Sequence, residues 1–215
     1  MRIDHPASAP WNPAEQALLK KLNTPAKVQD WLDSIPYTTD DACRSPRRVI
    51  RDRTAHCFEG ALFAAAALGF HGYGRRIIDM RAVRDDDHVI AVFQARGFWG
   101  AVAKSNFTGL RYREPIHRTV RGLVLSYFED FFNTAGEKTL REYSPPFDLS
   151  RFDRHGWMTA AEDLHHIGDA LDRARHVRVM TPAQVRGLRA VDPRFLKAGL
   201  LGSDPRGLYR VKPKR

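Results

Sequence analysis

Hydrophobic positions are densest in the stretch 54–70, where every position from Ala61 to Leu68 is apolar. Apolar residues on all sides of a helix predict that it is buried in the middle of the fold. Thr54 is the predicted N-cap, because its hydroxyl can accept a hydrogen bond from an amide of the first turn. Gly69 stands where a left-handed residue would end the helix. We therefore expect a central helix that organises the rest of the chain.

Shorter helical segments precede this central helix. Apolar residues repeat at helical spacing over 13–22 and again over 25–35. A capping residue followed by proline begins the second of these segments, and the same signal opens a short turn over 45–50.

After the central helix the pattern changes to β-branched and apolar strands. Strands are predicted over 76–83, 88–94 and 98–103, and the short connection between the last two indicates an antiparallel hairpin. A helix followed by a meander of strands is typical of an α+β core, with the helix packed on one face of an antiparallel sheet.

The remainder of the chain has a mainly helical pattern. The predicted elements are helices over 114–136, 159–176 and 181–201, an irregular segment over 139–153 and a basic tail over 202–215. Thr159 and Glu162 have the spacing of a capping box. The expected organisation is one domain, with an N-terminal arm and helix (1–23), a core (24–133) and a C-terminal helical extension with the basic tail (134–215).

Composition agrees with a soluble globular protein. The 215 residues are 43% hydrophobic and 28% charged, which is enough apolar material for one well-packed domain. The sequence has no apolar run of about 20 residues, as a membrane-spanning helix needs, and no apolar signal region near its beginning. Two cysteines do not make a disulfide framework, so a reducing, cytoplasmic setting is expected.

The formal net charge of +10 is the unusual bulk property. It could reflect an acidic partner such as nucleic acid, or only an arginine-rich composition. No helix-turn-helix signature, zinc-finger spacing or RNP-like motif supports the first reading, so nucleic acid stays open but disfavoured. Arg111 and Arg113 could line a cleft that favours an acidic substrate, or could lie on a solvated face. No metal-ligand spacing is present, and we expect no metal and no cofactor.

The chemistry-bearing residues are Cys57 and His88. Cys57 begins the central helix, where the helix dipole favours a thiolate and hence a nucleophile. His88 begins a strand 31 positions later, and a helix start packed on a sheet can place the two side by side. The next strand ends near Ser105 and Asn106, which supplies a third polar group. The alternative is that Cys57 is a small buried hydrophobic residue.

Three segments resemble a known superfamily. They are Thr54-Ala-His-Cys57-Phe-Glu-Gly-Ala61, Asp87-His88-Val-Ile-Ala-Val-Phe93 and Phe98-Trp99-Gly-Ala-Val102. They resemble the cysteine helix, histidine strand and tryptophan-bearing strand of the transglutaminase-like branch of the papain-like superfamily. The segment 104–128 resembles the corresponding sequence of a family of uncharacterised bacterial proteins assigned to that superfamily. The resemblance implies a Cys-His-Asp or Cys-His-Asn site that cleaves amide bonds, or transfers an acyl group to an amine, through a thioester.

One position departs from the family pattern. The superfamily has aspartate four residues after the tryptophan, where this chain has Ala103. Asn106 is the better replacement, because its amide oxygen can accept from imidazole; Ser105 shares the strand face of position 103. Asp79 and the aspartates at 85–87 are further candidates.

The expected roles follow from this assignment. Cys57 attacks as thiolate, its own amide donates to the oxyanion, and His88 transfers the proton. Substrate contacts are expected from His56, Trp99, Arg111 and Arg113. The competing hypothesis is a non-catalytic binding protein with the same fold, whose basic surface holds an acidic partner or nucleic acid.

Overall fold

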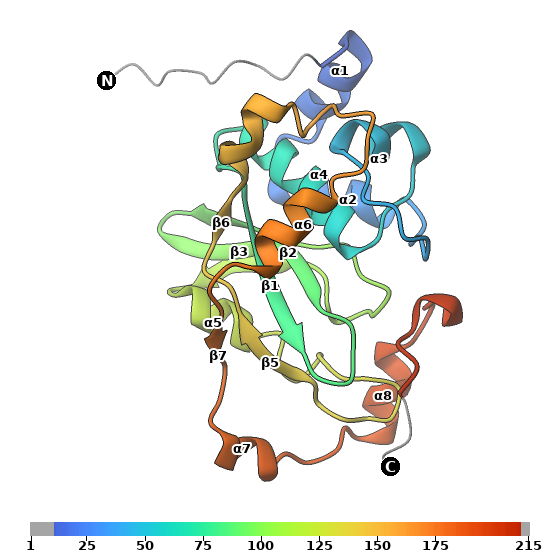
Figure 1. The fold of residues 1–215 in the computed structure, drawn as a ribbon, viewed down its shortest axis with the longest axis vertical. Coiled ribbons are helices and arrows are strands. Elements are labelled where there is room, and N and C mark those ends of the chain that lie inside the picture. Colours follow the sequence, from blue (N-terminus) through green and yellow to red (C-terminus); the bar gives the residue numbers. More distant parts are fainter. Residues whose placement is uncertain (1–10, 212–215) are drawn as a thin grey trace.

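The computed structural model describes residues 11–211, so most of the expected N-terminal arm (1–10) and the last four residues of the basic tail lie outside it. The structure confirms an α+β protein in which helices pack against an antiparallel sheet (Figure 1). No helix in the described part of the chain is long and apolar enough to cross a membrane.

The central helix is α4 (Cys57–Phe70), and its residues 61–68 are at most 2% exposed. The prediction of its N-cap was wrong. The cap is His56, whose Nδ1 accepts from the Phe58 amide at 3.3 Å, while Glu59 accepts from the His56 amide at 3.0 Å. Thr54 instead donates its hydroxyl to the carbonyl of Pro36. A neutral histidine can cap as serine does, because its unprotonated ring nitrogen is an acceptor, and this bond is lost when the ring is protonated.

Three short helices precede α4 in the chain; the sequence predicted the first two as helices and the third as a short turn, and the second and third pack against α4. The three helices are α1 (Pro13–Lys21), α2 (Pro25–Asp33) and α3 (Pro46–Asp52). Each begins with a side-chain cap followed directly by proline, which has no amide hydrogen that would need an acceptor. Figure 1 shows these helices gathered with α4 at one end of the molecule.

The sheet has the order β4-β3-β2-β1-β5-β7, and β6 pairs with β1. The strands are β1 (Arg76–Ala82), β2 (His88–Ala95), β3 (Phe98–Val102), β4 (Arg113–His117), β5 (Leu140–Tyr143), β6 (Phe147–Asp148) and β7 (Val177–Arg178). The sheet separates two hydrophobic cores, and alternate residues of β2 contribute to each, because successive side chains of a strand point to opposite faces. Val89 and Phe93 pack with α4, whereas Ile90 and Val92 face the second core with Tyr127.

Two of the predicted elements beyond β3 were wrong. Residues 113–117 form the edge strand β4, and only the short helix α5 (Val120–Leu125) follows where a long helix was expected. Pro115 suggested a helix start, but an edge strand also tolerates proline because one side of it needs no hydrogen-bond partner. The segment 139–153, expected to be irregular, supplies β5 and β6, which both pair with β1.

The C-terminal region is therefore part of the sheet as well as a helical extension. Its helical elements are η1 (Leu149–His155), α6 (His165–Asp172), α7 (Pro182–Arg186), α8 (Pro193–Gly199) and η2 (Pro205–Gly207). The capping box at Thr159 and Glu162 does not form: α6 begins six residues after Thr159, and the Thr159 hydroxyl donates to Gly156. Through β5 and β7, this region completes the side of the sheet next to β1.

Candidate active site

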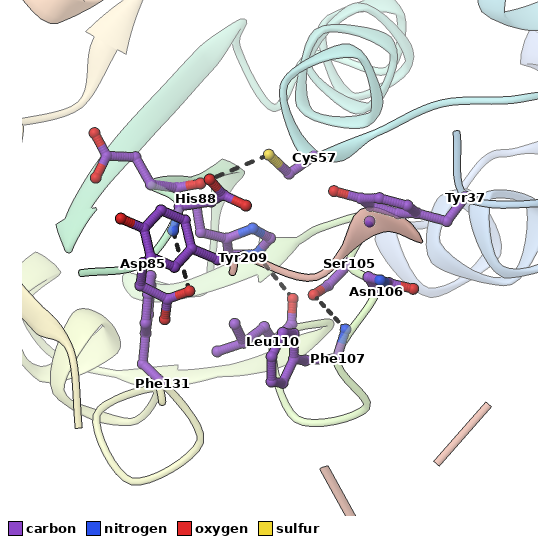
Figure 2. A pocket seen from close by; sticks show the side chains of 13 residues that line it. Tyr37, Cys57, Asp85, His88, Ser105, Asn106, Phe107, Leu110, Phe131 and Tyr209 are labelled. Carbon is purple, nitrogen blue, oxygen red and sulfur yellow. Dashed lines mark hydrogen bonds between the residues drawn. The ribbon is translucent and has the colours of Figure 1, made fainter. Parts of the chain in front are cut away.

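Cys57 and His88 lie in the wall of one pocket of about 170 Å³, which we call the thiol pocket. Cys57 is the first residue of α4, and His88 is the first residue of β2. Figure 2 shows the sulfur and the imidazole turned toward the same space, with Tyr37 on the other side of the sulfur. The Cys57 thiol is half-buried, and its sulfur lies 3.9 Å from the carbonyl oxygen of Asp87. The packing of α4 on β2 thus brings together two residues that are far apart in sequence.

A main-chain carbonyl fixes the orientation of His88. Its Nε2 donates to the carbonyl oxygen of Leu110 at 2.9 Å, and the side chain is buried. The ring of Phe131 meets the imidazole edge to face, with the ring centroids 6.3 Å apart. With Nε2 committed as a donor, Nδ1 is the nitrogen left for the thiol. The Leu110 carbonyl therefore selects the tautomer, which is the task of the third group in a nucleophile–base pair.

The roles predicted for Asn106 and Ser105 need correction, although both side chains border the thiol pocket. Asn106 donates to the main-chain oxygen of Asp204 and accepts from the Asp204 amide, both at 2.8 Å. The Ser105 hydroxyl accepts from the amide of Phe107. Asp79, another candidate, pairs with His176 at 2.9 Å. These side chains are occupied elsewhere, and Leu110 orients His88 in their place.

The surroundings of Cys57 favour its thiolate. Burial raises the pKa of Cys57, but hydrogen bonds and positive charge from His56 and His88 outweigh burial and lower this pKa to about 5. Burial acts in the opposite sense on His56, and contact with the Cys57 thiolate and Glu59 outweighs it to raise the pKa of His56 to about 9. A thiolate stabilised by neighbouring imidazoles is the nucleophilic form of cysteine.

His56 also anchors the start of α4. Its Nε2 donates to the carbonyl of Ala42 at 2.8 Å, a bond that both the neutral and the protonated ring can make, whereas its Nδ1 makes the capping bond described above only while the ring is neutral. Glu59, fully buried, accepts from both the amide and the guanidinium of Arg44. These bonds fasten the loop at 42–44 to the first turn of the helix. They hold the thiol at the N-terminus of α4, where the first amides of the helix have no acceptor within the helix.

Tyr37 is a site residue that the sequence reasoning missed. Its segment runs beside residue 55 in a parallel bridge, which sets the phenol next to the start of α4. Tyr37 borders the thiol pocket with Cys57, and burial and the nearby thiolate together raise the pKa of Tyr37. A tyrosine in a polar loop gives no periodic signal that could have marked it.

Carboxylates surround the thiol on two sides. Asp85, Asp86 and Asp87 border the thiol pocket. A second pocket of about 300 Å³, the acidic pocket, shares Cys57 and Asp87 with the first and is also bordered by His56, Asp79, Asp169 and Asp172. Burial raises the pKa of both Asp79 and Asp85 to about 6, so both are mostly ionised at neutral pH. The site is acidic in a protein whose net charge is +10.

Three predicted substrate contacts lie away from the thiol. Trp99 lies in β3 under the guanidinium of Arg76, 5.5 Å from the ring centroid. Arg111 pairs with Asp33, and Arg113 pairs with Asp130 while its guanidinium lies 4.0 Å from the ring centroid of Tyr127. The described residues that border the two pockets do not include these three. Of the four predicted contacts, His56 alone borders a pocket with Cys57.

The described residues contain no group of three or more histidine, cysteine or acidic side chains placed to hold a metal ion. Both cysteines are free thiols. Neither a protein-family model nor a curated protein sequence matches this chain. The functional argument therefore depends on the geometry of the Cys57 site.

Proposed function

We propose that this protein is a thiol-dependent amidase, peptidase or acyltransferase with a transglutaminase-like core. One observation carries the proposal: Cys57 begins a buried helix beside His88, and the far nitrogen of His88 donates to a fixed carbonyl. The helix packed on an antiparallel sheet is consistent with that core. The pairing of nucleophile, base and orienting group is the minimum that thioester chemistry requires.

In this proposal the Cys57 thiolate attacks the carbonyl carbon of an amide, and the carbonyl oxygen becomes an oxyanion. The Cys57 amide, at the start of α4, and the Tyr37 hydroxyl, which borders the same pocket, donate to that oxygen. His88 carries the proton taken from the thiol and gives it to the leaving amine, which leaves an acyl group on the sulfur. Water or a second amine then loses a proton to His88 and attacks the thioester, which restores the thiol.

The charge around the thiol indicates the kind of substrate. Carboxylates border both pockets, whereas the expected basic contacts Arg111 and Arg113 are paired elsewhere. Anionic walls attract cations and repel anions, so we infer a basic peptide or a protonated amine in place of the acidic substrate suggested by the net charge. The free thiols suit a reducing compartment, and we retain the cytoplasm as the proposed location.

The proposal can be tested by trapping the acyl-enzyme. We expect p-nitrophenyl acetate to release a burst of nitrophenolate and to leave one acetyl group on Cys57, seen by mass spectrometry of peptides. Cys57→Ser and His88→Ala should lose the burst, whereas Cys43→Ser should keep it. Addition of hydroxylamine should then give acetohydroxamate if an amine can act as acceptor. Equal acetylation of both cysteines, with no burst, would contradict the proposal.

A further inference from the structure

The last part of the chain crosses the thiol pocket. After α8 the chain turns at Gly202, which has a φ of 72°, and residues 204–211 run back toward the active site. We call these residues the C-terminal strap. Gly207 and Tyr209 of the strap line the same pocket as Cys57 and His88, and Figure 2 shows Tyr209 in its wall. The strap therefore forms part of the wall of the thiol pocket.

Specific contacts hold the strap in place. The Asn106 side chain forms two hydrogen bonds with the main chain of Asp204, one donated and one accepted, both 2.8 Å long. Further along, the Thr134 hydroxyl donates to the carbonyl of Tyr209. Gly207 lies so close to the body that an added Cβ would stand 2.9 Å from Thr39 and 3.2 Å from Tyr37. The strap is therefore closely packed against the rest of the protein at Gly207.

The strap leaves little room beside the thiol. The thiol pocket holds about 170 Å³, the volume of about six water molecules, whereas ligand sites commonly measure about 300–1,000 Å³. A peptide that enters the thiol pocket beside His88 would need the space that the strap occupies, whereas the described residues that border the acidic pocket include none of the strap. Every strap residue is at least partly exposed, so its release would uncover no fully buried side chain of its own.

Charge is consistent with this placement. Arg210 follows Tyr209 in the strap and is exposed, and the thiol pocket that the strap borders is lined by Asp85, Asp86 and Asp87. Attraction between an exposed arginine and nearby carboxylates weakens as salt is added.

We propose that the C-terminal strap is an autoinhibitory cover, which occupies the substrate groove of Cys57 and has to be displaced before substrate binds. The proposal rests on the proposed function in taking the thiol pocket as the substrate site. It gives Asn106, which we had expected to orient His88, the role of a clasp for the cover. A basic peptide or protein surface that competes for the same carboxylates would open the site.

The test compares the full chain with a form that ends at Ser203, and with Gly207→Val in the full chain. The matched control is Arg206→Ala, because, among the described residues, this exposed side chain bonds only to the carboxylate of Asp204. The probe is a bulky fluorescent maleimide, and the readout is its rate of addition to Cys57 relative to Cys43 in the same molecule. We expect truncation to raise this ratio at least tenfold, Gly207→Val to raise it several-fold, and Arg206→Ala to leave it unchanged.

The proposal that the strap is a cover would be wrong if the ratio of Cys57 to Cys43 labelling rates stayed within twofold of the full-chain value in both the truncated form and Gly207→Val. If truncation also raises the rate of maleimide addition to Cys43, the shortened protein is partly unfolded, and the result for Gly207→Val in the full chain then decides whether the strap covers the site. Release of a C-terminal peptide by the wild type but not by Cys57→Ser would show a cleaved segment instead of a cover. A pH midpoint of Cys57 labelling above 8 in the truncated form would contradict the proposed function, whereas the change in ratio reports on the strap alone.

Discussion

A pH series of alkylation should separate the two cysteines. The pKa of Cys57 is about 5, against about 8.5 for an ordinary thiol, a difference worth about 5 kcal/mol in favour of the thiolate. At pH 6 this makes about 300 times more thiolate than an ordinary cysteine has. A thiolate of lower pKa is a weaker nucleophile, here by about 40-fold. Cys57 should therefore react about 8-fold faster than an unperturbed thiol at pH 6 and slower than one above pH 9.

The assay is labelling with iodoacetamide from pH 4 to pH 10, with each cysteine quantified by mass spectrometry of its peptide. We expect the Cys57 rate to reach half of its plateau near pH 5. Burial, followed by the charges of Glu59 and Asp163, raises the pKa of Cys43 to about 11, so its rate should still be rising at pH 10. The C-terminal strap lowers the height of the Cys57 plateau but not its midpoint, so the midpoint is the quantity to compare.

Removing the imidazole tests the cause of the shift. We expect His88→Ala to move the Cys57 midpoint up by at least about one pH unit, because a hydrogen bond and a positive charge are lost. His117→Ala, in the edge strand β4, is the control and should leave the midpoint unchanged. Asn106→Ala should also leave it unchanged, since the Leu110 carbonyl orients His88. A midpoint near 8.5 in the wild type, or one insensitive to His88→Ala, would refute the reasoning.

Two further predictions concern stability, measured as the free energy of unfolding in urea. Gly60→Ala would place its Cβ 2.4 Å from the Cβ of Lys104 and should lower the free energy of unfolding by about 1–3 kcal/mol. Gly168→Ala, whose Cβ would have no neighbour closer than 3.9 Å, should stabilise α6 by up to about 1 kcal/mol. Equal effects of the two substitutions would contradict the close approach at Gly60. Burial raises the pKa of Asp85 to about 6, so the folded state loses stability as pH rises from about 4 to 6. Asp85→Asn should therefore add about 1–3 kcal/mol at pH 7.5 and almost nothing at pH 3.5, and a gain that is the same at both pH values would contradict this assignment.

The elements with the strongest patterns were predictable from sequence. The apolar run of α4 and the short runs of β-branched and apolar residues in β1, β2 and β3 indicate both type and position, because burial of those residues leaves few alternatives. The edge strand β4 carries Arg113, Glu114 and Pro115, a mixture that fits a helix start as well as a strand. What decides between them is pairing with β3, a contact between segments that a local pattern cannot show.

The same distinction separates the parts of the site. Cys57 and His88 stand at the ends of well-predicted elements, so the packing of helix on sheet was enough to bring them together. The orienting group is a main-chain carbonyl, and since every residue has one, side-chain chemistry gives no reason to choose Leu110. Asn106 has suitable chemistry, but its partner is Asp204, 98 positions further along the chain. The choice between the two depends on where the C-terminal strap lies.

The sign of the charge near the thiol has a similar explanation. A net charge of +10 describes the whole surface, but ions within about 8 Å dominate at physiological salt because more distant exposed charges are screened. The basic residues expected at the cleft are neutralised locally by Asp33 and Asp130. The carboxylates at 85–87 follow β1 and precede His88, so the topology that places the imidazole also places negative charge beside it. The residues that bring the base to the thiol thus also place negative charge in the thiol pocket, which is the basis on which we propose a cationic substrate.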